Sequence, residues 1–293
     1  MKGIREIRRR IKAVKNTAQI TKAMQLVASS KMKRAQDAAI ASRPYALLLS
    51  QILESAINRM HETAHPFFET RPVKKRGILL IATDKGLCGA LNGNLFRLVN
   101  DIKPADACFV TVGRKATQYI ARTGRDLLAD FIVTDKVGYN EVRPVVDFLT
   151  KAYQDGKIDT IEVMYSHFVN TLRQDPATDP LVPFESFEAE LEKLNLRLGA
   201  RASDEIAESR EIQFEPSAHV IINELPPLFL KQQIYTMILA AKASEHSARM
   251  VAMKSATDNA KQLVADLSLE YNKARQAGIT QEILEIAASA SAS

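Results

Sequence analysis

The chain has 293 residues, of which 46% are hydrophobic and 25% are charged, and it carries a formal net charge of +6. This length and composition suit a globular protein with one large domain or two ordinary ones. The longest apolar runs, such as Ile78 to Ala82, are far shorter than the roughly 20 residues of a membrane-spanning helix, which argues against a transmembrane protein. The two cysteines, Cys88 and Cys108, do not make a disulfide framework and favour a reducing compartment.

Residues 1–60 are expected to form a long helix with a coiled-coil seam. Apolar residues recur at alternating spacings of three and four, the pattern of helices that pack along one another. The only strong helix breaker after Gly3 is Pro44, which we expect to kink or split the helix. Fourteen of the seventeen seam positions are apolar, and the seam consists of Ile4, Ile7, Ile11, Val14, Ala18, Thr21, Gln25, Ala28, Met32, Ala35, Ala39, Ser42, Ala46, Leu49, Leu53, Ala56 and Met60.

The start of this segment is strongly basic. Residues 1–36 contain eleven Lys or Arg and a single acidic residue, Glu6. A basic helix indicates nucleic acid, an anionic membrane surface or an acidic protein as its partner. Readers of nucleic acid usually add aromatic side chains for stacking, and residues 1–36 contain none. A docking surface for a protein is therefore favoured, with a basic coiled-coil binder of nucleic acid as an alternative.

The middle of the chain predicts an α/β domain. Four short runs have the composition of strands, and they alternate with helical stretches near 90–101, 114–122 and 141–155. This alternation favours a mostly parallel sheet with crossover helices. Residues 174–183 are interpreted as a loop rich in Pro and Asp, and 184–216 are ambiguous apart from a strand-like piece at 211–214. The expected strands are 77–83, 108–112, 131–134 and 160–168.

A second long helix is expected near the C-terminus, because residues 228–277 contain neither Pro nor Gly. We expect Pro226 and Pro227 to bend or interrupt it near its start. A long helix needs a packing partner, so the first and last helices are expected to pair antiparallel. Its seam holds Leu239, Ala243, His246, Met250, Met253, Thr257, Ala260, Val264, Leu267, Tyr271 and Ala274.

The predicted class is thus α/β, with a long antiparallel two-helix coiled coil from the two ends and a central Rossmann-like α/β domain. The expected segments are an N-terminal coiled-coil helix at 1–60, the α/β domain at 75–210 and a C-terminal coiled-coil helix at 217–286.

One motif, TDKGLCGALN at 83–92, lies where a phosphate-binding loop would lie, after a strand and before a helix. It fits neither the phosphate-loop pattern, because Lys85 precedes the first glycine, nor the dinucleotide pattern, because Gly86 and Gly89 lack a third glycine in register. A tight strand-to-helix turn is the favoured interpretation. A nucleotide-dependent enzyme that uses this turn remains an alternative.

Other signs of catalysis are weak. Cys88 at a helix start could be a nucleophile, but a buried structural cysteine is favoured. The five histidines have no metal-ligand spacing, and His246 is expected to be packed or to face a partner. No pair of carboxylates stands out as acid and base.

Three blocks resemble the gamma subunit of bacterial-type F-type ATP synthases. They are residues 11–35 (IKAVKNTAQITKAMQLVASSKMKRA) with the following SRPY at 42–45, the motif at 83–92, and residues 244–286 (SEHSARMVAMKSATDNAKQLVADLSLEYNKARQAGITQEILEI). The first and third blocks are specific, and the second would be weak alone.

This resemblance implies a rotor of the central stalk and not a catalyst. It implies that ion-driven turning of a c-subunit ring drives conformational cycling of catalytic beta subunits in ATP synthesis and hydrolysis. The implied partners are the alpha and beta subunits, the epsilon subunit and the c ring, with no nucleic acid and no cofactor. The implied location is the cytoplasmic face of the bacterial plasma membrane, with peripheral attachment through the partners.

The same motifs imply contact residues. We expect Phe214 and Glu215 to approach the c ring. Seven residues are expected to contact the beta subunit, namely Lys22, Met24, Arg249, Arg275, Gln276, Thr280 and Glu282.

Overall fold

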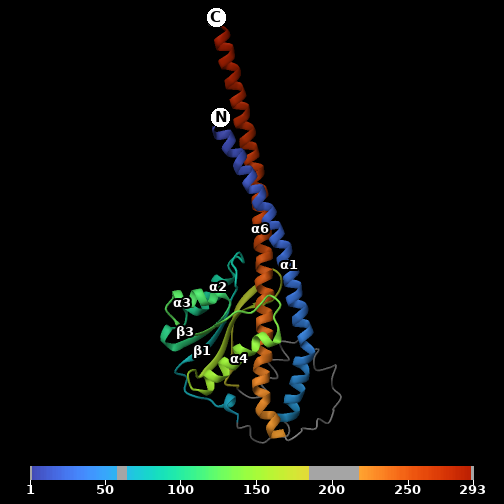
Figure 1. Ribbon diagram of the computed structural model, residues 1–293, viewed down its shortest axis with the longest axis vertical. Helices are drawn as coiled ribbons and strands as arrows, with labels where there is room; N and C mark the ends of the chain where they lie inside the picture. The colour runs from blue at the N-terminus through green and yellow to red at the C-terminus, as the bar shows by residue number, and fades with distance from the viewer. Residues whose placement is uncertain (1, 58–64, 185–217, 292–293) are drawn as a thin grey trace. The chain divides into compact units, whose positions relative to one another are not determined.

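The computed structural model describes residues 2–57, 65–184 and 218–291 (Figure 1). The chain divides into two compact units. One is the two-helix unit, made of residues 1–30 and 249–293, and the other is the sheet unit, residues 31–248. Helix α1 (Lys2–Ile57) and helix α6 (Ala218–Ser291) each contribute a segment to both units. No helix among the described residues offers an apolar stretch long enough to cross a membrane.

The sheet unit is built on a five-stranded sheet in the order β3-β2-β1-β4-β5. Neighbouring strands run parallel, except that β5 pairs antiparallel with β4. The strands are β1 (Arg76–Ile81), β2 (Ala107–Val112), β3 (Asp126–Phe131), β4 (Thr160–Phe168) and β5 (Gln174–Val182). The connecting helices are α2 (Leu91–Asn100), α3 (Arg114–Arg122) and α4 (Tyr139–Gln154), with 3₁₀ turns at Pro66–Phe68 and Pro104–Asp106.

Helices cover both faces of this sheet, because successive side chains of a strand point to opposite faces. Ile78 and Leu80 of β1 pack with α2 and α3 in one core. Leu79 and Ile81 of the same strand belong to the other core, with α4 and the sheet-unit segments of α1 and α6. Such strands read as continuous apolar runs, which explains GILLI at 77–81.

The α/β class is confirmed, but two expected elements at the edges of the sheet are wrong. Residues 174–182 form β5 and not a loop; Pro176 and Pro180 pair with β4 there, and an edge strand tolerates residues that lack an N–H. The third strand is Asp126–Phe131 and not 131–134. The strand-like piece at 211–214 lies outside the described residues.

The prolines do not divide the long helices. Pro44 lies inside α1, and Pro226 and Pro227 lie inside α6, so neither helix is split or interrupted at its prolines; the other alternative, a kink or bend there, stays a prediction. A proline in a helix costs about 3 kcal/mol or more through a lost hydrogen bond and a steric clash. Burial of nearby side chains such as Leu225 and Phe229 stabilises the helix against this cost. The limits 1–60, 75–210 and 217–286 stay predictions.

The close packing of β1 can be tested at Gly77. A Cβ added there would lie 2.5 Å from Ile158 Cδ1 and 2.6 Å from the carbonyl oxygen of Thr160. We expect Gly77→Ala to lower the free energy of unfolding by roughly 1–3 kcal/mol through overpacking. Gly93→Ala is the matched control, since nothing lies within 4 Å of its added Cβ and alanine favours a helix by about 0.5–1 kcal/mol. Urea unfolding should move in opposite directions for the two variants, and equal shifts would contradict the packing.

Candidate partner-binding surface

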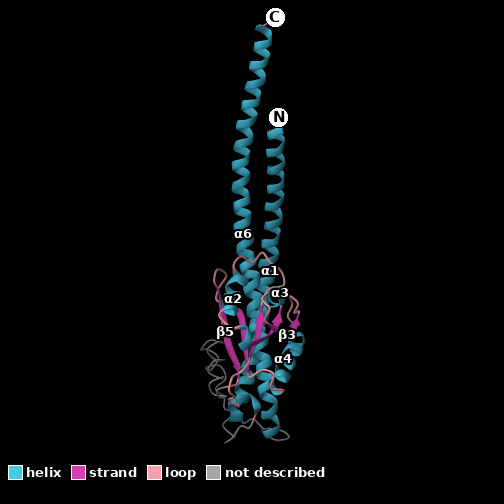
Figure 2. Ribbon diagram, turned by 90° about the vertical axis from the view of Figure 1, so that its left-hand side faces the viewer, coloured by secondary structure: helices cyan, strands magenta, loops and turns pink. Residues whose placement is uncertain are grey.

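The two-helix unit consists of residues 2–30 of α1 and residues 249–291 of α6 (Figure 2). The pairing is antiparallel, because Thr21 lies against Thr257 whereas Ile4, earlier in α1, lies against Gly278, later in α6. The hydroxyl oxygens of Thr21 and Thr257 are 2.7 Å apart. A Cβ built on Gly278 would lie 3.7 Å from Ile4 Cδ1. The expected coiled-coil pairing of the two ends is thus confirmed.

The seam follows the predicted spacing. On α1 the seam positions from Ile4 to Ala28 are buried or half-buried, whereas most residues between them are exposed. On α6 the most buried positions of this unit are Met253, Thr257, Ala260 and Leu267, all predicted seam residues. Small side chains such as Ala28 and Ala260 at a buried seam let two helix backbones approach closely.

The buried threonine pair is satisfied internally. Thr21 Oγ1 lies 3.1 Å from the carbonyl oxygen of Ala18, and Thr257 Oγ1 lies 2.8 Å from that of Met253. Each hydroxyl has one proton, so one threonine donates to its own helix and the other donates across the seam. The pair gives the apolar seam one directional contact between its helices.

The two flanks of the α1 seam differ in chemistry. Of the eight positions that directly follow seam residues from Ile4 to Ala28, five are basic and exposed, and these five are called the basic flank. The five positions that directly precede seam residues between Ala13 and Val27 carry no charge and are called the apolar flank, whereas Glu6 and Arg10 before them are charged. The basic flank holds Arg5, Arg8, Lys12, Lys15 and Lys22, and the apolar flank holds Ala13, Thr17, Ile20, Met24 and Val27.

The predicted contact residues Lys22 and Met24 therefore lie on opposite sides of the seam. Two residues correspond to about 200° around a helix of 3.6 residues per turn. Lys22 is exposed, and its Nζ donates to Gln25 Oε1 at 3.3 Å, while Met24 is half-buried. A single partner segment on one side of the seam would therefore not meet both side chains equally.

The predicted contact residues of α6 also lie on more than one face of their helix. Gln276 and Thr280 are four residues apart on one face, and Thr280 Oγ1 donates to the carbonyl oxygen of Gln276 at 3.0 Å. Arg275 and Glu282 are seven residues apart and share a neighbouring strip of the helix. All four are exposed, whereas Arg249 at the start of the segment is half-buried. Phe214 and Glu215 lie outside the described residues.

Sequence reasoning missed the large apolar side chains that this unit exposes. Ile20 and Leu26 are each 60% exposed on α1, and Leu269 and Ile283 are 58% and 60% exposed on α6. Ile20 precedes a seam position and Leu26 follows one, so the exposed apolar side chains of α1 are spread over both sides of its seam and are available to partners there. The available signal was the presence of large apolar residues outside the 3-4 seam positions.

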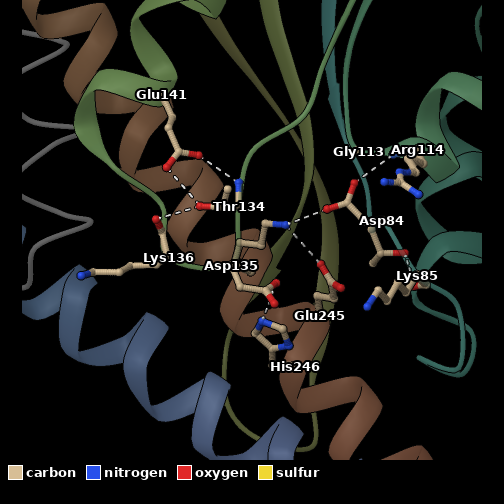
Figure 3. Close-up of polar contacts among 12 residues, drawn as sticks. Asp84, Lys85, Gly113, Arg114, Thr134, Asp135, Lys136, Glu141, Glu245 and His246 are labelled. Carbon is tan, nitrogen blue, oxygen red and sulfur yellow. Dashed lines mark hydrogen bonds and ion pairs between the residues drawn. The ribbon is translucent and has the colours of Figure 1, made fainter.

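The motif at 83–92 forms a tight turn in the sheet unit. Asp84 Oδ1 accepts a hydrogen bond of 3.2 Å from the N–H of Arg114 at the start of α3, and Asp84 Oδ2 lies 3.3 Å from Lys242 Nζ (Figure 3). Thr83 and Asn92 close the turn, with Asn92 Nδ2 donating to Thr83 Oγ1 at 2.7 Å. Asp84 thus binds the start of α3 and Lys242, while Thr83 and Asn92 tie the turn to α2, which favours the structural interpretation of this motif.

The structure also places Cys88 and His246, the candidates for a nucleophile and for a packed or partner-facing residue. Cys88 is a buried free cysteine, in keeping with a structural role. Leu87 beside it has a φ of 63°, unusual for a residue with a side chain, and it is 61% exposed. His246 is buried on α6, with Nε2 3.5 Å from Asp135 Oδ1, so it is packed within the sheet unit. Among the described residues no group of His, Cys, Asp and Glu is arranged to hold a metal ion.

Comparison with known structures identifies the class of fold. The chain is similar to a chain in the OSCP, F1 and c-ring structure of the Euglena gracilis mitochondrial ATP synthase in rotational state 3. The TM-score is 0.69 at 19% sequence identity, and the match covers 99% of this chain and 94% of that chain. At this identity the match shows the fold, a coiled-coil and α/β architecture found in ATP synthases.

Comparison with known sequences identifies the family. The ATP synthase family model matches residues 3–292. The ATP synthase gamma chain of Opitutus terrae is 54% identical over 98% of this chain and 98% of its own length. That of Methylacidiphilum infernorum is 46% identical over 98% of this chain and 97% of its own. The chain belongs to the ATP synthase gamma chain family.

The close approach of the helices in this unit can be tested at Ala28. Its side chain is 2% exposed, so we expect Ala28→Leu to force the helices apart and to destabilise the pair by roughly 1–3 kcal/mol. Ala23→Leu, at an exposed position of the same helix, is the matched control and should change stability by less than about 0.5 kcal/mol. Thermal unfolding followed by circular dichroism measures both. A loss in the control equal to that in Ala28→Leu would argue against the close seam.

Proposed function

We propose that this chain is the central-stalk rotor subunit of an F-type ATP synthase. In this role it couples ion-driven rotation of a c-subunit ring to conformational cycling of catalytic beta subunits. The observation that supports this most directly is the two-helix unit, whose flanks differ in chemistry, in a chain of the gamma family. The catalytic sites belong to the partner subunits, and the chain itself is non-catalytic and needs no cofactor.

The difference between the flanks gives rotation its effect. A shaft inside a ring of like subunits presents a different surface to each of them at any angle. A subunit that meets the basic flank of Arg5, Arg8 and Lys12 is biased toward a different conformation from one that meets Ile20 and Met24. The size of the shift between two nucleotide-binding states is set by how much the free energy of contact with the shaft differs between those states.

The apolar flank suits a bearing. Dispersion contacts of Ile20, Val27 and Met24 have little directional preference, so their energy changes smoothly as the shaft turns. The basic flank suits attraction to acidic segments of a partner, which complementary charge orients and holds. As the shaft turns, each surrounding subunit then meets the apolar flank and the basic flank in turn.

We propose that two groups of residues contact the beta subunit. Lys22, Met24 and Arg249 form the first, with Lys22 and Met24 approached from opposite sides of the seam. The second group is exposed near the end of α6 and consists of Arg275, Gln276, Thr280 and Glu282. Phe214 and Glu215 are proposed to approach the c ring on the strength of the motif alone.

The proposed partners are the alpha and beta subunits of the catalytic ring, the epsilon subunit and the c ring. The similar Euglena chain comes from a structure that contains F1 and a c ring, which supports the catalytic ring and the c ring as partners. The proposed location is the cytoplasmic face of the bacterial plasma membrane, with attachment through the partners.

Reconstitution tests the proposal as a whole. The chain alone is expected to hydrolyse no ATP, whereas its addition to its own alpha and beta subunits should restore ATPase activity. The measurement is steady-state release of phosphate with and without the chain. Equal ATPase activity with and without the chain would contradict the proposed rotor function.

The second contact group can be tested separately. Replacing Arg275 and Gln276 together by Leu should lower coupled turnover several-fold, which corresponds to a loss of about 0.5–2 kcal/mol in coupling free energy. Assembly should stay intact, because both side chains are exposed. The control replaces Lys151 and Gln154, an exposed cation and amide of α4, by Leu. Turnover and subunit stoichiometry are measured for both. Unchanged turnover in the Arg275 and Gln276 variant would mean that these contacts are misassigned.

A further inference from the structure

A run of buried polar side chains interrupts the apolar face of α6 in the sheet unit. From Leu225 to Ala241 most of the buried positions of α6 hold apolar residues, such as Phe229 and Ile238. The next turns bury the polar residues Lys242, Ser244, Glu245, His246 and Ser247, each no more than 4% exposed. Burying charged groups is unfavourable unless they are paired, so a run of this kind needs a reason other than packing.

These side chains bind α6 to three separate loops of the sheet unit. Figure 3 shows two of these loops, those that carry Asp84 and Asp135. Lys242 Nζ lies 3.3 Å from Asp84 Oδ2 in the turn after β1. His246 Nε2 lies 3.5 Å from Asp135 Oδ1 in the loop after β3. Ser247 Oγ donates to the carbonyl oxygen of Thr171, at 2.7 Å, in the hairpin between β4 and β5.

The three loops lie at one edge of the sheet. Each follows the carboxyl end of a strand, and β1, β3 and β4 run in the same direction. We call the three loop residues Asp84, Asp135 and Thr171 the collar. In open α/β folds this edge is where ligands bind. In this chain the side chains of α6 contact it instead.

The collar also holds α1. Lys31 Nζ donates to Asp135 Oδ2, so one carboxylate contacts a side chain from each long helix. Burial by itself raises the pKa of the Asp135 carboxyl, but the hydrogen bond from Lys31 and the charges of His246 and Lys242 lower that pKa below its usual value. Asp135 is therefore held as a carboxylate that accepts a hydrogen bond from Lys31 of α1 and attracts His246 of α6.

Geometry separates these contacts from the apolar packing around them. A shift of α6 along or about its axis moves polar and apolar contacts alike, but polar contacts weaken steeply with distance and angle. Such a shift would break the hydrogen bonds of Lys242 and Ser247 and the ion-pair contact of His246. Buried polar pairs of this kind add little net stability and fix one arrangement.

We propose that the collar is a rotational lock, in which Asp135, Asp84 and Thr171 fix α6 and α1 against the sheet unit so that torque passes between them without slip. Asp135 is the central positioning residue because it joins both helices. The inference rests on the rotor function proposed above and adds the site at which the sheet unit and the long helices are held in register.

The first test removes the contacts of Asp135 and Ser247 and leaves the buried pair of Lys242 and Asp84 unchanged. Asp135→Asn and Ser247→Ala are combined in the complete ATP synthase, which is reconstituted in lipid vesicles with its own subunits. ATP-driven ion uptake and ATP hydrolysis are measured together. We expect the ratio of uptake to hydrolysis to fall about twofold or more, while hydrolysis continues.

The matched control is Asp147→Asn, which removes the same charge from an exposed pair within α4, where Asp147 Oδ2 lies 3.4 Å from Arg143 Nε. Its ratio of uptake to hydrolysis should equal that of the unmodified enzyme. An unchanged ratio in the double variant, or an equal fall in the control, would overturn the lock.

If the double variant fails to assemble, a disulfide between α6 and the β4–β5 hairpin tests the lock instead. Thr171→Cys and Ser247→Cys place two thiols where Ser247 now contacts the Thr171 backbone. If the lock is rigid in the working enzyme, oxidation to the disulfide should leave coupling unchanged. Loss of coupling on oxidation and its return on reduction would show that α6 must move past the hairpin, which would overturn the proposal.

The two proposals fail in distinguishable ways. If the unmodified chain does not support ion uptake with its partners, the rotor function fails. If it does, and the double variant couples equally well, only the collar proposal fails.

Discussion

The structure depends on burying one stripe of each long helix along its length. A helix of 56 or 74 residues gains most of its stability from packing and little from intrinsic propensity. In the two-helix unit each helix packs against the other through Ala28, Thr257 and Ala260. In the sheet unit α6 packs into the same core as β1 and α4. One helix therefore presents two kinds of buried stripe, small residues for a helix partner and large apolar residues for a sheet.

The sequence predicted those features that depend on local periodicity. The 3-4 spacing gave the seam and its partner, and the buried strands appeared as apolar runs at 77–81 and 108–112. Strand β5 was missed because Pro176 and Pro180 are typical of loops, and only its position at an edge makes them acceptable. The sequence left open whether Pro226 and Pro227 bend or interrupt the helix, because burial of Phe229 and its neighbours is not visible in a linear pattern.

The candidate site was predicted less completely than the fold. Motif matching nominated residues, but whether two of them share a side of the helix pair depends on the seam. Lys22 and Met24 are separated because one follows and the other precedes a seam position. The pairs of the collar join residues as far apart in sequence as Asp84 and Lys242, and no local pattern links them. Long-range polar contacts of this kind require the folded structure.

The end of α6 has a thermodynamic consequence for assembly. Gly278 lies against Ile4, and the described side chains of α6 that follow it, Ile279 and Ile283 among them, are exposed. A helical end that buries little of its apolar surface is marginal in water. Enclosure of this end by other subunits would thus be coupled folding and binding. Its signature is a negative heat-capacity change larger than rigid docking gives, and part of the affinity is spent on ordering the helix.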